Sequence, residues 1–421
     1  MNECYGMNAR FLLKTIGHIT LAGLFLCGMS ACKDKGRWSG GDDNSPDDSS
    51  RVLNQPAQIS RLIPARVADR DAWAADISRI MDELKISKTQ ENVCSVIAVV
   101  DQESNFVANP SVPDLGNKAI KAFQTEVPQK FVRQFGPALG PAVSRYFNSV
   151  LVNEPSKENS FLVQMRNVKT EQQLDLIYRQ IFAYVSKQFY ADSITNAAAR
   201  FMGKDIGEDN NPITTIGSMQ VLVKYAREHQ RDNATVNELR DYMYTREGGL
   251  YYGIHRLMKY PAAYDNPQYR FADYNSGMYS SRNAAFQQDI NKLLNTDMAL
   301  DGDLLLYDKD DKAQSMPSQT ETALNQLFAD HGVVMKTEQI RSDLLQEKQA
   351  EFENTSTYQN VIALYKQQFG KNPPYAIMPQ VIISGPKLSK DYNTNWYATN
   401  VTRRYETCMR HGGGTGRHRK R

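Results

Sequence analysis

The sequence predicts a mainly α-helical protein with little β-sheet. Apolar residues recur at helical spacing in many segments, several of these segments are too long for strands, and only one stretch near the C-terminus is strand-like. With 421 residues, 41% of them hydrophobic and 23% charged, the chain can bury a large core as one big domain or two. The net charge of +3 is close to neutral for this length and gives no reason to expect a nucleic-acid partner.

Residues 1–31 have the features of a lipoprotein signal peptide. Arg10 and Lys14 form a basic region, residues 16–29 form an apolar stretch, and small residues directly precede Cys32. The apolar stretch is shorter than the roughly 20 residues of a membrane-spanning helix, although a single-pass anchor is the alternative. We therefore expect removal of residues 1–31, a lipid on Cys32, and contact with the membrane through that lipid.

The residues after Cys32 indicate where the protein is located and predict a disordered tether. Lys33, rather than an aspartate, follows the cysteine, which in many Gram-negative bacteria favours the periplasmic face of the outer membrane. Residues 33–50 are rich in Gly, Ser, Asp, Lys and Pro, so residues 32–63 are predicted to be a disordered tether. Beyond it, Cys94 and Cys408 lie in an oxidising compartment, where they can form a disulfide or remain two separate buried thiols.

The folded part is expected to begin with two helices. Residues 71–84 carry apolar side chains at helical spacing. Ser87 and Gln90 then resemble the start of a capping box for a second helix, which runs to Glu103. Its β-branched residues also suit a buried strand, but its apolar period and its length favour a helix.

The remaining elements continue the helical pattern. Gly136 and Gly140 are expected to break a helix at residues 129–152. Further helices are predicted at residues 170–190, 219–229, 236–244, 249–259, 284–294, 320–330, 337–352 and 357–369, and a strand-like stretch at residues 375–383. The basic, Gly-rich residues 410–421 are predicted to be a disordered tail.

Glu103, at the end of the second helix, is the main candidate for chemistry. Val96, Val99 and Val100 share a helical face with it, so its carboxyl should emerge beside an apolar packing surface. Desolvation there, and the negative end of the helix dipole, should raise its pKa, as a general acid near neutral pH requires. Taken alone, the position is better explained as an exposed charge at a helix end.

Two short downstream motifs contain side chains suited to binding a sugar. Gly217-Ser-Met-Gln-Val221 supplies a glutamine, which can donate and accept, and a methionine suited to the floor of a sugar site. Ala272-Asp-Tyr-Asn-Ser-Gly277 supplies a tyrosine suited to orienting the acid and an asparagine suited to binding sugar or capping a helix. Taken alone, the first is an ordinary loop-to-helix junction and the second a plain turn with a half-buried tyrosine.

The three motifs, in this order, resemble those of the soluble lytic transglycosylases, relatives of goose-type lysozyme. Glu103-Ser104 resembles the Glu-Ser signature of that family, Gly217-Ser-Met-Gln220 its Gly-Leu-Met-Gln, and Ala272-Asp-Tyr-Asn275 its Ala-Tyr-Asn-Ala-Gly. Residues 248–257 resemble the helix that the family places between its last two motifs. The resemblance implies that Glu103 is the single catalytic acid and base. It also implies these substrate-binding residues: Ser104, Ser218, Met219, Gln220, Tyr274 and Asn275.

The chain departs from the family pattern in two ways, since Ser218 replaces a leucine and the stretch before Gly217 is unusually long. The resemblance therefore implies a lysozyme-like helical core at residues 64–300, with a large helical insertion at about 117–210. Residues 301–409 would form a C-terminal α-rich extension. Over its whole length the chain also resembles a proteobacterial lipoprotein family known only as a domain of unknown function.

The implied activity is that of a peptidoglycan lytic transglycosylase, a carbon–oxygen lyase. Glu103 would protonate the oxygen between N-acetylmuramic acid and N-acetylglucosamine. It would then take the proton of the muramyl 6-hydroxyl, which closes on the anomeric carbon to give a 1,6-anhydro end. The expected partners are glycan strands and, as further candidates, cell-wall or envelope proteins; no metal and no cofactor is implied.

Two alternatives remain open. If Asp273 orients a water molecule, the enzyme is a lysozyme-like hydrolase, a muramidase with two carboxylates. Asp101 and Asp114 are the other nearby acids, and Asp101 projects elsewhere on the helix than Glu103. The second alternative is a non-catalytic peptidoglycan-binding or scaffolding lipoprotein, which the long insertion and the altered Gly-Ser-Met-Gln motif favour.

Overall fold

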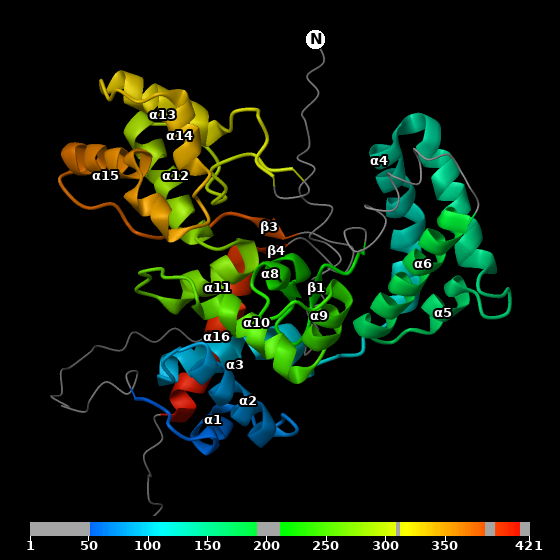
Figure 1. Cartoon of the computed structure of the whole chain (residues 1–421). Helices are drawn as coiled ribbons and strands as arrows, with labels where there is room; N and C mark the ends of the chain where they lie inside the picture. Colours follow the sequence, from blue (N-terminus) through cyan, green and yellow to red (C-terminus); the bar gives the residue numbers. More distant parts are fainter. Residues whose placement is uncertain (1–50, 192–210, 309–311, 384–391, 413–421) are drawn as a thin grey trace, which may run out of the picture. The chain divides into compact units, whose positions relative to one another are not determined.

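The computed structural model describes residues 51–191, 211–308, 312–383 and 392–412. This part of the chain is mainly helical, with four short strands in two antiparallel pairs, which confirms the predicted mainly α class (Figure 1). It divides into two compact units: one holds the described residues up to Phe106 and from Leu250 onward, and the other holds Val107–Gly249. The predicted signal peptide and Cys32 lie outside the described residues.

The first unit contains α1 (Pro56–Leu62), α2 (Arg70–Glu83), α3 (Gln90–Ser104), α11 (Pro267–Ser276), α12 (Ser280–Leu294), α13 (Gln319–Asp330), α14 (Thr337–Leu344), the 3-10 helix η4 (Ala350–Asn354), α15 (Ser356–Phe369), β3 (Ile382–Ile383), β4 (Tyr392–Asn393) and α16 (Thr394–Gly412). The second contains α4 (Leu115–Asn153), α5 (Phe161–Asn167), α6 (Glu171–Ala191), β1 (Thr215–Ile216), β2 (Val221–Leu222), α8 (Val223–Glu228) and α9 (Val236–Met243). Helix α10 (Arg246–Met258) contributes residues to both. Within the described chain, none of the helices combines the length and apolar character needed to cross a membrane.

The folded part begins before residue 64. Val52 forms an isolated antiparallel bridge with Thr89, and Leu53 is buried. Pro56 opens α1, where its missing N–H leaves no hydrogen bond unmade. The prediction of a tether is therefore wrong for residues 51–63, because Leu53, Ile59, Leu62 and Ile63 are buried in the first unit. Residues 32–50 lie outside the described ranges.

Helices α2 and α3 confirm the two helices predicted at the start of the folded part. The N-cap of α3 is Thr89, whose hydroxyl accepts from the Asn92 N–H at 3.2 Å, so the predicted capping box of Ser87 and Gln90 is wrong. The helix ends after Ser104 because Asn105 adopts a left-handed backbone conformation with φ 53°. Glu103 thus lies in the last turn of α3.

Helix α3 is buried along its length, and α16 packs along it and against α11 (Figure 1). A disulfide joins Cys94 of α3 to Cys408 of α16, so the structure has the paired form of the two alternatives left open by the sequence. The Gln90 side chain donates to the Met409 carbonyl at 2.9 Å beside it. The sequence pattern did not indicate α16, yet this helix covers the helix that carries Glu103. Its described end also includes residues 410–412, which were assigned to the tail; the rest of that tail lies outside the described chain.

Helices α12 to α15 surround a hydrophobic cluster, which includes Phe286, Leu324, Phe328, Leu344 and Phe352. Helix α12 packs on α13 and α15 and also on α11. The predicted boundary between residues 300 and 301 therefore does not separate compact units. Helix α12 packs both on α11, which precedes it, and on α13 and α15, which follow the boundary.

Several predicted elements differ in detail from the structure. The helix predicted at 337–352 ends at Leu344 and is followed by η4, and the strand-like stretch at 375–383 is reduced to β3. The break predicted at Gly136 is confirmed by its non-helical backbone, with φ 76°, whereas Gly140 continues the helix. The helix predicted at 219–229 begins only at Val223, because residues 215–222 form the β1–β2 hairpin.

The second unit is fixed by a buried ion-pair network around Asp175 of α6. This carboxylate is fully buried and pairs with Arg179 of the same helix and with Arg240 of α9. The Asn211 amide donates to it at 2.6 Å. Two arginines and an amide satisfy the buried charge, which makes the relative positions of α6 and α9 specific.

Buried Glu347, which accepts a hydrogen bond from the N–H of Leu304 in this hydrophobic cluster, should make the stability of the protein depend on pH. Burial, with nearby Asp303, raises the pKa of its carboxyl from 4.5 to about 8. The folded state therefore keeps the proton that the unfolded state releases, and stability falls as the pH rises from 4.5 towards 8. Glu347→Gln should gain about 2–4 kcal/mol of unfolding free energy relative to wild type between pH 5 and pH 8. Urea unfolding at the two pH values measures this, and an equal difference at both would contradict it.

Candidate functional site

Glu103 is a buried carboxyl with one engaged and one free oxygen. Its side chain is only 3% exposed. The Tyr397 hydroxyl of α16 donates a hydrogen bond to Oε1. Among the described residues, no group hydrogen-bonds Oε2, although that atom is buried. A buried carboxyl oxygen without a partner is costly to maintain, so this atom calls for an explanation.

The surroundings of Glu103 raise its pKa to about 7. Desolvation by burial is the largest cause, and it outweighs the Tyr397 hydrogen bond and the charges of Arg404 and Arg256, which lower the pKa. The raised pKa was expected from the position of Glu103 beside an apolar face. A carboxyl with this pKa can hold and release a proton near neutral pH.

Two arginines on different helices act on the carboxyl through their charge. Arg404 of α16 lies near Asp101 of α3, with 3.2 Å between its Nε and Asp101 Oδ2, and its Nη1 donates to the Asn400 carbonyl at 3.1 Å. Asp101 also pairs with Arg66. Asp101 is therefore held by two cations and is not a second free carboxylate for Glu103, which agrees with its expected projection away from that residue.

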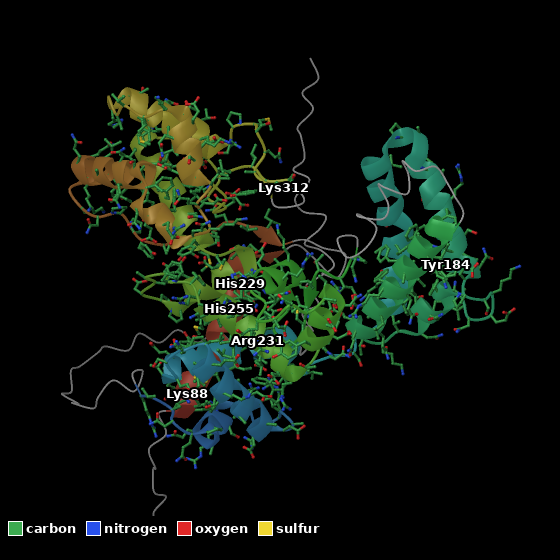
Figure 2. All side chains as sticks on the ribbon, in the orientation of Figure 1. Lys88, Tyr184, His229, Arg231, His255 and Lys312 are labelled. Carbon is green, nitrogen blue, oxygen red and sulfur yellow. A yellow bond between two sulfur atoms is a disulfide. The ribbon has the colours of Figure 1, made fainter. Side chains whose placement is uncertain are left out.

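Arg256 of α10 links the site to the motif of α11. Its guanidinium lies 5.3 Å from the centre of the Tyr274 ring, and its Nη2 donates to the Tyr274 carbonyl at 3.0 Å. The preceding residue on α10, His255, is labelled in Figure 2 and stacks on Tyr251. Tyr274 is buried, and it adds to burial and the Glu103 charge in raising the pKa of Tyr397. The hydrogen bond to Glu103 Oε1, however, comes from Tyr397.

Asn275 and Ser104 contact protein groups. The Asn275 amide lies 3.5 Å from the hydroxyl of Thr394, the first residue of α16. The Ser104 hydroxyl donates to the Val100 carbonyl at 3.1 Å, inside α3. The Asn275 contact thus joins α11 to α16, whereas the Ser104 bond stays within its own helix, and neither side chain shows an arrangement dedicated to a ligand.

Asp273 is a satisfied structural carboxylate. Its oxygens accept hydrogen bonds from the Tyr264 hydroxyl at 2.6 Å, the Tyr260 hydroxyl at 3.1 Å, and the groups at the start of α12. Those groups are the N–H of Tyr279, the hydroxyl of Ser280 and the N–H of Ser281. A carboxylate with this many donors is not available to orient a water molecule, which weakens the hydrolase alternative.

The Gly217-Ser-Met-Gln-Val221 motif forms the turn between β1 and β2 in the second unit. Gly217 has φ +84°, and a Cβ there would lie 2.5 Å from the Met243 carbonyl, so only glycine fits. Ser218 and Met219 are fully buried. The Gln220 amide accepts from the Thr215 hydroxyl at 3.1 Å and donates to the Gly217 carbonyl at 3.2 Å and to Glu171 at 3.4 Å.

The residues of this motif therefore make contacts within the second unit. The amide that was expected to bind sugar uses both its oxygen and its nitrogen on protein groups. Met219 belongs to the core of the unit. These observations fit the interpretation of the motif as a tight turn, and the motif and Glu103 belong to different compact units.

Sequence reasoning missed the residues that contact Glu103 or act on its charge: Tyr397, Arg404 and Arg256. A signal was present for two of them, since Tyr397, Val401, Arg404 and Cys408 follow helical spacing along one face. Their partner on α3 lies about 300 positions earlier, and no pattern in a single sequence links them. In the described ranges, no three His, Cys, Asp or Glu side chains are grouped as metal ligands would be.

Comparisons with known proteins give a family without an assigned activity. Residues 66–411 match the model described as "Protein of unknown function (DUF1615)". The chain is 33% identical over 362 residues to an Escherichia coli (strain K12) protein described as the uncharacterized protein YaiW, a match that covers 86% of this chain and 91% of that protein. No solved structure matches. The chain therefore belongs to the DUF1615 family.

Proposed function

We propose that this protein is a peptidoglycan lytic transglycosylase in which Glu103 is the single general acid and base. The observation that carries the proposal is the Glu103 carboxyl itself: buried, with a pKa of about 7, one oxygen held by Tyr397 and the other without a partner. The motif resemblance suggests which reaction this carboxyl would catalyse. We further propose a lysozyme-like core around α3, and attachment through a lipid on Cys32 to the periplasmic face of the outer membrane.

The reaction needs one carboxyl group. Protonated Glu103 gives its proton to the oxygen between N-acetylmuramic acid and N-acetylglucosamine as the bond from that oxygen to the muramyl anomeric carbon breaks. The acetamido group of the muramyl unit stabilises the positive charge that develops. Ionised Glu103 then takes the proton from the muramyl 6-hydroxyl, whose oxygen closes on the anomeric carbon. The product is a 1,6-anhydro end, no water is consumed, and Glu103 regains its proton.

Access to Glu103 requires a rearrangement. Both its oxygens are buried in the described chain, so a glycosidic oxygen reaches Oε2 only when groups around it move. Closure around bound substrate is common in enzymes that exclude water from the reaction. Exclusion of water suits this reaction, because a water molecule at the anomeric carbon would give a hydrolysis product.

A second candidate is a non-catalytic peptidoglycan-binding or scaffolding lipoprotein. Two observations favour it: the Gln220 amide is used within its own unit, and Glu103 is closed off from solvent. In this case the same fold would contact glycan strands or an envelope protein without cutting. Product analysis separates the two candidates.

The test is incubation of the chain from Lys33 onward with purified peptidoglycan sacculi, followed by mass spectrometry of the released fragments. We expect fragments with 1,6-anhydro-muramyl ends. Reducing muramyl ends would indicate a hydrolase. No release, with the protein pelleting with sacculi, would overturn the proposal in favour of the binding role.

The cleavage rate should fall as the pH rises above about 7. Glu103 acts first as an acid, and its pKa of about 7 means that the protonated form disappears above that value. Rates measured from pH 5 to pH 9 should decrease about tenfold per pH unit on the alkaline side. A rate that stays level to pH 9 would mean that another group supplies the proton.

A further inference from the structure

We propose that the end of the α3–α16 pair opposite Glu103 binds the phosphate groups of the membrane that holds the Cys32 lipid. This end, the exit surface, is formed by Arg51, Gln90, Met409, Arg410 and His411. The proposal goes beyond peptidoglycan cleavage, and it uses the proposed lipid only to identify the membrane. It gives a task to the basic residues 417–421, which the cleavage reaction does not use.

Two segments that are distant in the sequence leave the first unit at the exit surface. The Gln90 N–H donates to the Arg51 carbonyl at 3.0 Å, and the Gln90 side-chain amide donates to the Met409 carbonyl at 2.9 Å. Gln90 is only 1% exposed, so both bonds are shielded from water. One buried residue therefore holds the point where the chain arrives from Cys32 beside the point where α16 ends.

Further contacts hold the exit surface together. Val52 forms its antiparallel bridge with Thr89 directly beside Gln90. The disulfide between Cys94 and Cys408 lies one turn further along α3. Helix α1 packs on both α3 and α16 (Figure 1). The two points at which the chain leaves this surface therefore keep their positions in the folded protein.

The positive charge of the chain is concentrated at the exit surface and in the residues that follow it. Residues 410–421 contain five of the 50 Lys and Arg residues and none of the 47 Asp and Glu residues. Without these residues the net charge of the chain changes from +3 to −2. An anionic membrane therefore attracts residues 410–421 and weakly repels the rest of the protein, which favours one orientation on the membrane.

The described side chains of the exit surface are close to neutral in sum. Arg51 and Arg410 are exposed there, and so are Glu91 of α3 and Glu406 of α16. The excess of positive charge is supplied by residues 417–421, in which Arg417, Arg419, Lys420 and Arg421 carry it. The folded unit thus determines where these basic residues begin, and the sequence determines their charge.

The length of the connecting chain allows the exit surface to touch the membrane. Cys32 and Arg51 are 19 positions apart, so the chain between them spans at most about 65 Å, whatever its structure. Gly412 and Arg417 are five positions apart and span at most about 17 Å. A membrane is favoured over an anionic partner in solution, because such a partner would not require both segments to leave the fold at one place.

Binding at the exit surface places Glu103 at the far end of the membrane-bound helix. Gln90 is the first residue of α3, and Glu103 lies in its last turn, so the two are about 20 Å apart along the helix axis. The end of α3 that binds the membrane and the end that carries the proposed acid are therefore opposite ends of one helix. This arrangement directs the acid away from the lipid and towards the periplasm.

The first test measures binding of the chain from Lys33 onward, which has no lipid, to phosphatidylcholine vesicles with and without phosphatidylglycerol. The test variant removes four positive charges beyond the exit surface: Arg417→Gln, Arg419→Gln, Lys420→Gln and Arg421→Gln. The matched control removes four from exposed lysines elsewhere in the first unit: Lys312→Gln, Lys336→Gln, Lys366→Gln and Lys371→Gln. Thermal unfolding checks that both variants are folded, and sacculus pelleting is measured in parallel.

We expect wild type and the control variant to bind vesicles that contain phosphatidylglycerol, less tightly at high salt, and not phosphatidylcholine alone. The test variant should bind at least about a hundredfold less tightly at low salt, because each basic side chain at an anionic surface contributes about fivefold. Wild-type binding by the test variant, or binding that ignores phosphatidylglycerol, overturns the proposal. Sacculus binding that needs residues 417–421, without vesicle binding, overturns it in favour of an anionic wall polymer.

The second test determines which end of the first unit faces the membrane. A fluorophore is attached at Asn54→Cys, close to Arg51, or at Gln367→Cys on α15; both positions are exposed. A spin-labelled lipid in phosphatidylglycerol vesicles should quench the first fluorophore and leave the second unchanged, and equal quenching of both overturns the proposal. Palmitate incorporation into the whole chain, lost in Cys32→Ala, tests the lipid separately. Vesicle binding through the exit surface without palmitate incorporation supports this surface as a membrane contact and refutes the proposed attachment.

Discussion

Glu103→Gln is expected to reduce the release of anhydro-muropeptides from sacculi by about a hundredfold to ten-thousandfold, the usual contribution of a general acid. Glutamine has nearly the same shape, and its amide oxygen can accept the Tyr397 hydrogen bond as Oε1 does. The variant lacks only the proton that the reaction transfers. Since Glu103 is the single acid and base in the proposed mechanism, both its steps are lost together.

The matched control is Glu91→Gln, the same substitution on the exposed first turn of α3. Its cleavage rate should equal that of wild type. Glu103→Gln should be no less stable than wild type at pH 8, because the wild-type carboxyl is ionised there at a buried position and the amide is not. Cleavage within a factor of about three of wild type by a folded Glu103→Gln protein would remove Glu103 from its proposed role.

Loss of the Cys94–Cys408 disulfide should lower the free energy of unfolding by about 4–5 kcal/mol. The bond closes a loop with a sequence separation of 314, and cross-links over long loops restrict the unfolded chain most. In the folded state the bond also joins α3 to α16, two helices with extensive mutual packing. The double variant Cys94→Ala, Cys408→Ala should therefore unfold at clearly lower denaturant concentration than wild type.

Addition of a thiol reductant provides the second half of this experiment. Reduced wild type should approach the stability of the double variant, and the double variant should not respond to reductant. The Gln90–Met409 and Arg404–Asp101 contacts remain in both proteins, so native packing should survive near neutral pH. A double variant as stable as oxidised wild type would show that the loop is already restricted in the unfolded state.

The helical elements of the fold were predictable where apolar spacing is regular. Helices α2, α3 and α15 appear within a few residues of their predicted positions, because one buried face per helix imposes that spacing. Helix α16 was not recognised, since its first turns are rich in Asn, Thr and Tyr and read as polar. The β1–β2 hairpin was also missed, because the composition around residues 215–222 favours a helix. In the structure, Gly217 and Gln220 have positive φ, so the helix begins only at Val223.

The candidate site was predictable only on its α3 side. The position of Glu103 at the end of an apolar helix and the rise of its pKa follow from local sequence alone. The identity of the tyrosine did not follow: the motif pointed to Tyr274, and the hydrogen bond comes from Tyr397. Partners separated by 294 residues are brought together by the packing of whole helices, which a single sequence does not encode in any local pattern.

This separation has a consequence for how the protein is made. Glu103 is synthesised 294 residues before Tyr397. During most of synthesis the acid therefore lacks its hydrogen-bond donor, and α3 lacks the helix that covers it. Contacts this distant along a chain also form late in folding. The Glu103 site can therefore form only after α16 has been synthesised. A fragment that ends at the predicted domain boundary near residue 300 would leave α3 without the helix that covers it, and we expect such a fragment to aggregate.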